Sequence, residues 1–232
     1  MTIPSIKSAE LKLFEVWRKK LGNNHGFYSD GVVNEDEFRK SKKRILFLLK
    51  EVNSGNSKEG GCLIEFLSKG APGGGWKTWN DIARWTKGLR RYFESKEIIN
   101  FTEVDHVDVE SRKELLSHIA AMNLDKTGGG GTADWEDIRQ AKERDWAEIK
   151  KQMALYQADI VVCCGTFGLI EELAENDAIK QTNRGVRFFE TSLSFGGDKR
   201  TVFIDHCHPA ARIKKQYKLY TLLDAVAEIF PS

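Results

Sequence analysis

Short, uninterrupted apolar runs recur along the chain, and each is bounded by polar or glycine-rich segments. The first three are residues 45–50 (ILFLLK), 119–124 (IAAMNL) and 159–165 (DIVVCCG). Runs without polar alternation are typical of strands that are covered on both faces, as in parallel sheets. Two further strands are predicted at residues 185–190 (GVRFFE) and 201–209 (TVFIDHCHP), joined by a turn at GGDK.

Segments with apolar residues at helical spacing lie between these strands. The first helix is predicted from about 8 to 21, with Ser8 as its N-cap and Leu11, Phe14, Val16, Trp17 and Leu21 on its apolar face. Further helices are predicted at residues 79–93, 111–117, 135–153, 167–175 and 213–230. Strands that alternate with helices predict a wound α/β sheet. We therefore expect one domain over residues 1–232, a three-layer α/β/α fold with a central, mainly parallel sheet.

Composition narrows the class of protein. The 232 residues are 41% hydrophobic and 30% charged, which fits a globular domain and argues against disorder. The apolar runs are far shorter than the roughly 20 residues of a membrane-spanning helix. The N-terminus has acidic residues and no apolar core of the kind found in signal peptides. We expect a cytoplasmic monomer with no membrane partner.

The charged residues and cysteines add little by themselves. The net charge is +2, so a nucleic-acid partner would need a local basic surface. Cys62, Cys163, Cys164 and Cys207 form no CxxC pair, and we expect reduced, mostly buried thiols. Because Cys163 and Cys164 are adjacent in a predicted strand, their side chains should point to opposite faces of the sheet.

Polar residues collect where the predicted strands end. The segments are residues 50–55 (KEVNSG), 122–126 (MNLDK), 163–167 (CCGTF) and 205–212 (DHCHPAAR). In open α/β sheets, ligands bind outside the carboxyl ends of the strands. The sequence therefore predicts a binding site formed by these segments.

Three of these strand ends, in this order, resemble the uracil-DNA glycosylase superfamily. KEVNSG stands where the family has a water-activating motif, MNLDK where it has a base-reading asparagine, and CHPAAR where it has His-Pro. The resemblance covers residues 45–212. It implies a monofunctional DNA glycosylase that hydrolyses the N-glycosidic bond of a flipped-out, uracil-like or modified base and leaves an abasic site. Such an enzyme would act in base-excision repair or in defence against phage DNA with modified bases.

The resemblance also assigns roles at the scissile bond. Cleavage leaves positive charge on the sugar and negative charge on the base, so the reaction needs one group at each pole. The family's pattern makes His208 the group that stabilises the departing base. For the water, EVNSG resembles Gly-Ile-Asn-Pro-Gly and indicates Asn53, whereas KEVN resembles Gly-Glu-Ala-Pro and indicates Glu51. Both assignments stay open, because the usual proline is absent.

Further family positions would bind the base and the DNA backbone. Asn123 offers a donor and an acceptor to a pyrimidine edge, and NLDK is similar to the Asn-Val-Val-Lys stretch of the thermophilic-type enzymes. An aromatic ring should stack on the base, and the candidates are Phe66, Trp76 and Trp79, of which Trp79 also fits a helix core. The expected DNA contacts are Lys126, Arg212, Lys214 and Lys215.

The thermophilic-type enzymes hold an iron–sulfur cluster through four cysteines, including a CxxC pair. This chain has no such pair, so we expect no cluster, metal or other cofactor. The glycines at 128–131 lack a Gly-Lys-Ser/Thr ending and favour a flexible loop beside the pocket. Two alternatives stay open: a metal-dependent hydrolase that uses Asp205, His206 and His208, and a non-catalytic nucleic-acid-binding module.

Overall fold

A seven-stranded sheet in the order β2-β6-β3-β8-β11-β10-β9 forms the centre of the computed structural model. The structure describes residues 4–22, 26–54, 59–73, 77–130, 133–174, 178–193 and 199–231. The four middle strands run parallel: β6 (Ile119–Asn123), β3 (Ile45–Leu49), β8 (Ile160–Cys164) and β11 (Arg200–His206). The outer strands β2 (Gly31–Val32), β10 (Arg187–Ser192) and β9 (Lys180–Gln181) pair antiparallel with their neighbours. The predicted, mainly parallel sheet is confirmed.

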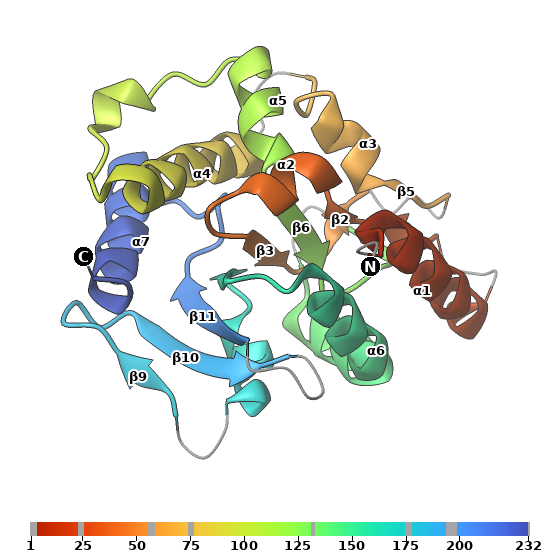
Figure 1. Cartoon of the computed structure of the whole chain (residues 1–232). Coiled ribbons are helices and arrows are strands. Elements are labelled where there is room, and N and C mark those ends of the chain that lie inside the picture. Colours follow the sequence, from red (N-terminus) through yellow and green to blue (C-terminus); the bar gives the residue numbers. More distant parts are fainter. Residues whose placement is uncertain are drawn as a thin grey trace.

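Helices cover both faces of this sheet, so the fold is the predicted three-layer α/β/α arrangement. One layer contains α3 (Leu63–Ser68), α4 (Lys77–Ser95), α5 (Val109–Ser117) and α7 (Lys215–Ile229). The other contains α1 (Ile6–Leu21) and α6 (Trp135–Tyr156), which pack on each other, and α2 (Glu35–Lys40) adds Phe38 to their core. Figure 1 shows α4 and α7 on one side of the strands and α1 and α6 on the other. None of the described helices has the length and apolar character needed to cross a membrane.

The buried strands supply a core to each helical layer. In β3, Ile45 and Phe47 pack into the core under α4 and α7, whereas Leu46 and Leu48 pack into the core under α1 and α6. Burying each such side chain contributes roughly 1.5–3 kcal/mol, which explains why the strands show no polar alternation. Cys163 and Cys164 enter opposite cores in the same way, as predicted, and burial raises the pKa of both thiols.

Two predicted helices differ from the structure. The first begins at Ile6, because Ser5 is its N-cap and accepts from the Ser8 amide; Ser8 is therefore not the cap. Leu11 and Val16 are 62% and 60% exposed, because the buried face of this helix runs through Phe14 and Trp17. The described part of the helix predicted at 167–175 forms two 3₁₀ turns, Phe167–Leu169 and Glu171–Leu173, in place of one helix. The predicted GGDK turn lies mostly outside the described residues.

Two small parallel pairings lie outside the main sheet. In one, β1 (Tyr28–Ser29) pairs with β5 (Gly61–Cys62). In the other, β4 (Val52–Asn53) pairs with β7 (Gly128–Gly129). The second pairing joins the segment after β3 to the segment after β6, and it therefore brings two of the predicted site segments together.

Candidate functional site

A cavity of about 840 Å³ lies at the carboxyl ends of the parallel strands. Six of the candidate site residues line it, and they come from three strand ends and two helices: Glu51, Asn53, Phe66, Trp79, Asn123 and His208. Other lining residues are Tyr28, Lys50, Cys62, Lys77, Ala210 and Ala211. Three of the four predicted strand ends therefore meet at this cavity, whereas none of its lining residues comes from the fourth, residues 163–167.

The segment after β3 is held in place by the glycines of β7. The Ser54 amide donates to the Gly129 carbonyl at 3.1 Å, next to the β4–β7 pairing. A Cβ atom on Gly128 would lie 2.1 Å from Ser54 Oγ, and one on Gly129 would lie 1.9 Å from Glu51 Oε2. A side chain at either position would therefore displace Ser54 or Glu51. The expected flexible loop is a paired strand at Gly128 and Gly129, so that prediction was wrong there.

Glu51 and Asn53 both reach the cavity, but they sit in different surroundings. Asn53 is exposed, whereas Glu51 is half-buried. Burial raises the pKa of Glu51, and the nearby Asp125 and Asp137 carboxylates raise it further, while Lys50 opposes them. A carboxyl group with a raised pKa is a stronger base when it is ionised.

Asn123 ends β6 and is held by a buried carboxylate. Its backbone N–H and its Nδ2 donate to Asp30 Oδ2 at 2.7 and 3.3 Å, and its carbonyl accepts from Lys126 Nζ at 2.9 Å. Lys126 has no exposed surface, and its ammonium lies 2.7 Å from both Asp30 oxygens. A DNA phosphate cannot reach a cation in this position. The predicted DNA contact of Lys126 is therefore wrong.

His208 lies two residues beyond β11, and its ring orientation is fixed by the turn that follows. The Ala210 N–H donates to His208 Nδ1 at 3.1 Å, so in the neutral imidazole the proton is on Nε2. Burial lowers the pKa of His208, and the charges of Lys50 and Lys218 lower it further. His208 is therefore a neutral group at neutral pH whose Nε2–H can donate.

A second buried ion pair anchors the loop that carries His208. Lys218 donates to the carbonyl of Pro209 and pairs with Asp81, and both Lys218 and Asp81 are almost fully buried. Arg84 Nη1 donates to the other oxygen of Asp81 at 2.6 Å. The backbone after His208 is therefore fixed to α4 and α7.

The three residues of the predicted metal site do not converge. Asp205 accepts from Arg187 at 2.8 and 3.0 Å, and His206 is buried with its ring edge-on to Trp85 at a centroid distance of 4.6 Å. Within the described part of the chain, no three His, Cys, Asp or Glu side chains form a group that could hold a metal ion. The alternative of a metal-dependent hydrolase at these residues is therefore contradicted.

The aromatic candidates differ in position. Phe66 is half-buried on α3 and lines the cavity together with Trp79, a residue that is 7% exposed and belongs to the core. Trp76 lies outside the described residues. Lys50 lies in the predicted site segment 50–55, although no role was assigned to it. Sequence reasoning missed Tyr28, which lies in a polar stretch with no strand pattern.

Lys50, which lines the cavity, lies over the ring of a neighbouring tryptophan. Lys50 Nζ lies 3.9 Å from the ring centroid of Trp135, the first residue of α6, whose side chain is half exposed. An ammonium over an exposed aromatic ring is stabilised by roughly 0.5–1 kcal/mol. The apolar residues at helical spacing in 135–153 include Trp135, which would place it on the buried face of α6; the structure leaves it half exposed.

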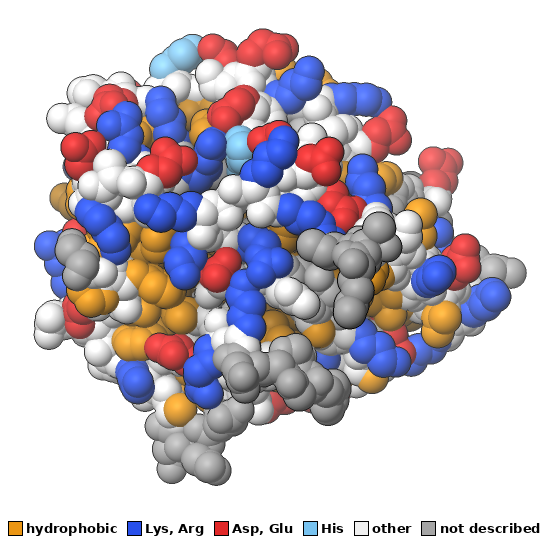
Figure 2. Space-filling view, viewed as in Figure 1, with side chains coloured by type: hydrophobic (Ala, Val, Ile, Leu, Met, Phe, Trp, Pro, Cys, Tyr) orange, Lys and Arg blue, Asp and Glu red, His pale blue; other side chains and the backbone are white. Residues whose placement is uncertain are grey.

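The predicted basic segment lies beside the cavity. Arg212, Lys214 and Lys215 are exposed and directly follow Ala210 and Ala211, which line the cavity. Lys215 pairs with Asp105 at 3.1 Å. Over the face drawn in Figure 2, Lys and Arg side chains are interspersed with Asp and Glu side chains, in keeping with the small net charge.

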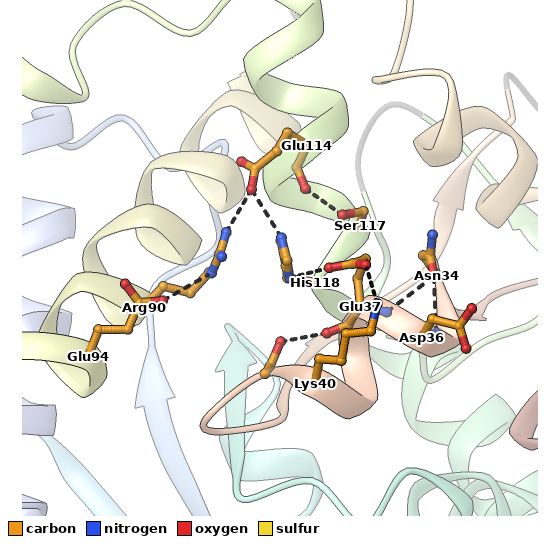
Figure 3. A network of polar contacts seen from close by, with 10 residues as sticks. Asn34, Asp36, Glu37, Lys40, Arg90, Glu94, Glu114, Ser117 and His118 are labelled. Atoms are coloured by element: carbon orange, nitrogen blue, oxygen red, sulfur yellow. Dashed lines mark hydrogen bonds and ion pairs between the residues drawn. The ribbon is translucent and has the colours of Figure 1, made fainter.

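A smaller cavity of about 230 Å³ lies near the opposite, amino end of the sheet. Beside it, His118 contacts Glu114 at 3.0 Å and Glu37 at 3.9 Å, and Arg90 donates to Glu114 at 2.8 Å (Figure 3). These contacts join α2, α4 and α5. The network ties helices together through paired charges, and we assign the functional site to the larger cavity.

Comparisons with known proteins do not extend this picture. The chain matches no protein-family model, and a search of curated protein sequences also gave no match.

Proposed function

We propose that the chain is a DNA glycosylase that hydrolyses the N-glycosidic bond of a flipped-out base and leaves an abasic site. The observation that carries this proposal is the meeting of Glu51, Asn123 and His208 around one cavity at the ends of three parallel strands. Glycoside hydrolysis needs a group for the water and a group for the leaving base, and base recognition needs a donor and an acceptor. These three side chains supply all of them.

His208 would act on the departing base. Its Nδ1 is occupied by the Ala210 N–H, so its Nε2–H can donate to a base oxygen on which negative charge develops. A neutral imidazole donor does not need to bind a proton first, and the lowered pKa keeps His208 neutral.

Of the two candidates for activating the attacking water, Glu51 has the more suitable surroundings. An ionised carboxylate can take a proton from water and can stabilise a cationic sugar, whereas an amide can only orient the water. Burial and two neighbouring carboxylates make Glu51 the more basic group. Asn53 would then contribute a positioning contact.

The volume of the cavity favours a base larger than an unmodified pyrimidine. About 840 Å³ lies towards the upper end of the roughly 300–1,000 Å³ of pockets that hold drug-sized ligands. A modified base, such as a phage cytosine with a bulky 5-substituent, fits this volume better than uracil. We therefore place defence against phage DNA ahead of base-excision repair.

A panel of oligonucleotides tests the proposal. Single- and double-stranded substrates would carry uracil, hypoxanthine, a thymine mismatch or glucosylated hydroxymethylcytosine, followed by alkaline scission of abasic sites. We expect scission at one of these bases, and most strongly at the bulky one. The absence of scission at every base would reject the glycosylase in favour of a non-catalytic nucleic-acid-binding module.

Two substitutions separate the candidates for the water. Glu51→Gln should lower the single-turnover rate by about 10²-fold or more, since it removes the base but keeps the shape. Asn53→Ala should cost about tenfold or less, as expected for a positioning contact. The reverse order of the two losses would assign the water to Asn53.

A further inference from the structure

A cluster of buried polar side chains surrounds the carboxylate of Asp30. Lys126 Nζ donates to both of its oxygens at 2.7 Å, Gln152 Nε2 donates to Oδ1 at 2.8 Å, and the Asn123 N–H donates to Oδ2 at 2.7 Å. Asp30 is 1% exposed, and Lys126 and Gln152 have no exposed surface. We call these four residues the Asp30 cluster. Every neighbour in it offers Asp30 a donor, so the site suits an ionised carboxylate that only accepts.

This carboxylate also fixes the side chain of Asn123. The Nδ2 atom of Asn123 lies 3.3 Å from Asp30 Oδ2. If the amide rotated by 180°, its oxygen would face a carboxylate, and two acceptors would meet in a buried site where the cost is highest. The orientation of the amide therefore follows from the chemistry of Asp30.

The backbone of Asn123 is fixed by the same cluster. Lys126 Nζ donates to the Asn123 carbonyl at 2.9 Å, and the Asn123 N–H is bonded to Asp30. Gln152 also donates to the Tyr156 hydroxyl at 2.6 Å, which braces the side of Asp30 that faces α6. Asn123 is thus held at its N–H, its carbonyl and one amide hydrogen, while it lines the cavity.

We propose that Asp30 is a positioning residue that sets base specificity, because it allows the Asn123 amide only one order of donor and acceptor. This inference rests on the proposed glycosylase function. A keto base such as uracil presents an acceptor at position 4 and a donor at N3, whereas cytosine presents an amino donor and an acceptor. If the Asn123 amide could rotate, it could form hydrogen bonds with both kinds of base. A fixed amide can form them with only one kind.

The energetics fit a role in specificity. A buried ion pair adds little net stability compared with apolar residues of the same size, because each charge must leave water. Asp30 and Lys126 could therefore be replaced by apolar residues at small cost to folding. Such residues would leave the Asn123 amide free to rotate.

The test compares two substrates that differ only in the group at position 4 of the base. Both carry the same 5-substituent, one as a keto base and one as an amino base, and excision is measured under single-turnover conditions. In Asp30→Asn, the new amide can donate or accept, so Asn123 can adopt both orientations. We expect the excision rate of the preferred base, divided by that of the other base, to fall by about tenfold. This is the discrimination that one paired contact to a base edge provides.

Asp81→Asn is the matched control. It makes the same chemical change in the other buried Asp–Lys pair, which contacts Arg84 and the loop after His208 but not Asn123. We expect it to lower both rates and to leave their ratio unchanged. A purely structural role of Asp30 would give the same pattern for both variants, and that result would overturn the proposal.

If Asp30→Asn fails to fold, the double variant Asp30→Asn/Lys126→Met removes both charges and leaves no unpaired ion in the core. The same fall in the ratio is expected for it. A wild-type protein that excises both bases at equal rates would also overturn the proposal.

A measurement without substrate separates this proposal from the glycosylase function. In wild-type protein, the side-chain amide of Asn123 should give one exchange-protected NMR signal pair, and in Asp30→Asn it should exchange between two states. If the wild type excises no base but shows the single amide state, the proposed function fails while the orientation of Asn123 stands. Two amide states in the wild type would contradict the fixed orientation.

Discussion

The backbone that follows each of two strands, β6 and β11, is fixed by a buried Asp–Lys ion pair. After β6, Lys126 pairs with Asp30 and donates to the Asn123 carbonyl, and after β11, Lys218 pairs with Asp81 and donates to the Pro209 carbonyl. The two ends differ in what the aspartate holds. Asp30 binds the side chain of a cavity residue, whereas the described contacts of Asp81 are with Arg84 and Lys218.

This difference indicates how the cavity residue at each of the two strand ends is held in place. At the β6 end, side-chain orientation is fixed from inside the core. At the β11 end, the backbone is fixed from the core, and the His208 ring is oriented by its own turn through the Ala210 N–H. The Asn123 amide has two chemically different ends, so its orientation must be fixed by a neighbouring side chain. The tautomer of His208 is already set by the Ala210 N–H, so only the backbone after His208 has to be fixed.

The largest expected effect is the loss of either aspartate. Asp30→Ala and Asp81→Ala should each lower the free energy of unfolding by about 3–5 kcal/mol, because a buried lysine is left without its counter-charge. Urea denaturation measures this loss. The double variant Asp30→Leu/Lys126→Met should recover most of it, and a double variant as unstable as Asp30→Ala would show that the pair itself supports the fold.

The two ends should also differ in their response to pH. Burial raises the pKa of Glu10, which lies beside the Asp30 cluster, from 4.5 to about 7. Since the folded state holds this proton more tightly, Glu10 favours folding most below pH 4.5, and stability falls as pH rises through about 7. The loss is about 3 kcal/mol. Glu10→Gln should abolish this part of the pH dependence in urea titrations between pH 4.5 and 8.

At the end of β11, stability is expected to depend on pH in the opposite direction. Burial lowers the pKa of His206 from 6.5 to about 4. Its contribution is fully present above pH 6.5 and is lost as pH falls through about 4. This acid limb should persist in Glu10→Gln, which serves as its internal control. If Glu10→Gln lost both parts of the pH dependence of stability, their assignment to Glu10 and to His206 would be contradicted.

Among the described residues, no buried Asp–Lys pair holds the third strand end, after β3, and Gly129 lies against Glu51 there. A Cβ on Gly129 would collide with the Glu51 carboxylate, so Gly129→Ala should displace Glu51 and lower the excision rate by about 10²-fold. Gly168→Ala is the control, since a Cβ there meets no atom within 4 Å. Equal rates for Gly129→Ala and the control would remove Glu51 from the reaction.

The smallest effect is expected at the exposed basic segment beside His208. Lys214→Ala should weaken DNA binding about equally for all sequences and reduce the slope of log affinity against log salt by about 1. Lys12→Ala, on the exposed side of α1, is the control. An unchanged slope for Lys214→Ala would place the DNA elsewhere.

The fold could be predicted because its signals are local. Five-residue apolar runs such as 45–49 and 160–164 are typical of strands covered on both faces, and their alternation with helices predicts a mainly parallel sheet. The positions of Glu51, Asn123 and His208 followed from the rule that ligands bind at the strand ends. These predictions depend only on where each strand stops.

The rest depended on contacts between distant segments. Lys126 has the same sequence signature as an exposed lysine, and only its approach to Asp30, 96 residues away, explains its burial. Asp205 and His206 were assigned together to a metal, but adjacent residues in a strand face opposite sides of the sheet. Gly128 and Gly129 indicated flexibility, although their role is to admit the side chains of Ser54 and Glu51.

The release of the base by His208→Ala tests the proposed glycosylase most directly. Single-turnover excision from the best substrate of the panel would be measured for this variant and for His106→Ala, which changes an exposed histidine that does not line the cavity. We expect a loss of about 10²–10³-fold for His208→Ala, as for the removal of one donor to a developing anion, and none for His106→Ala. A folded His208→Ala protein that releases the base at the wild-type rate would contradict the proposed function.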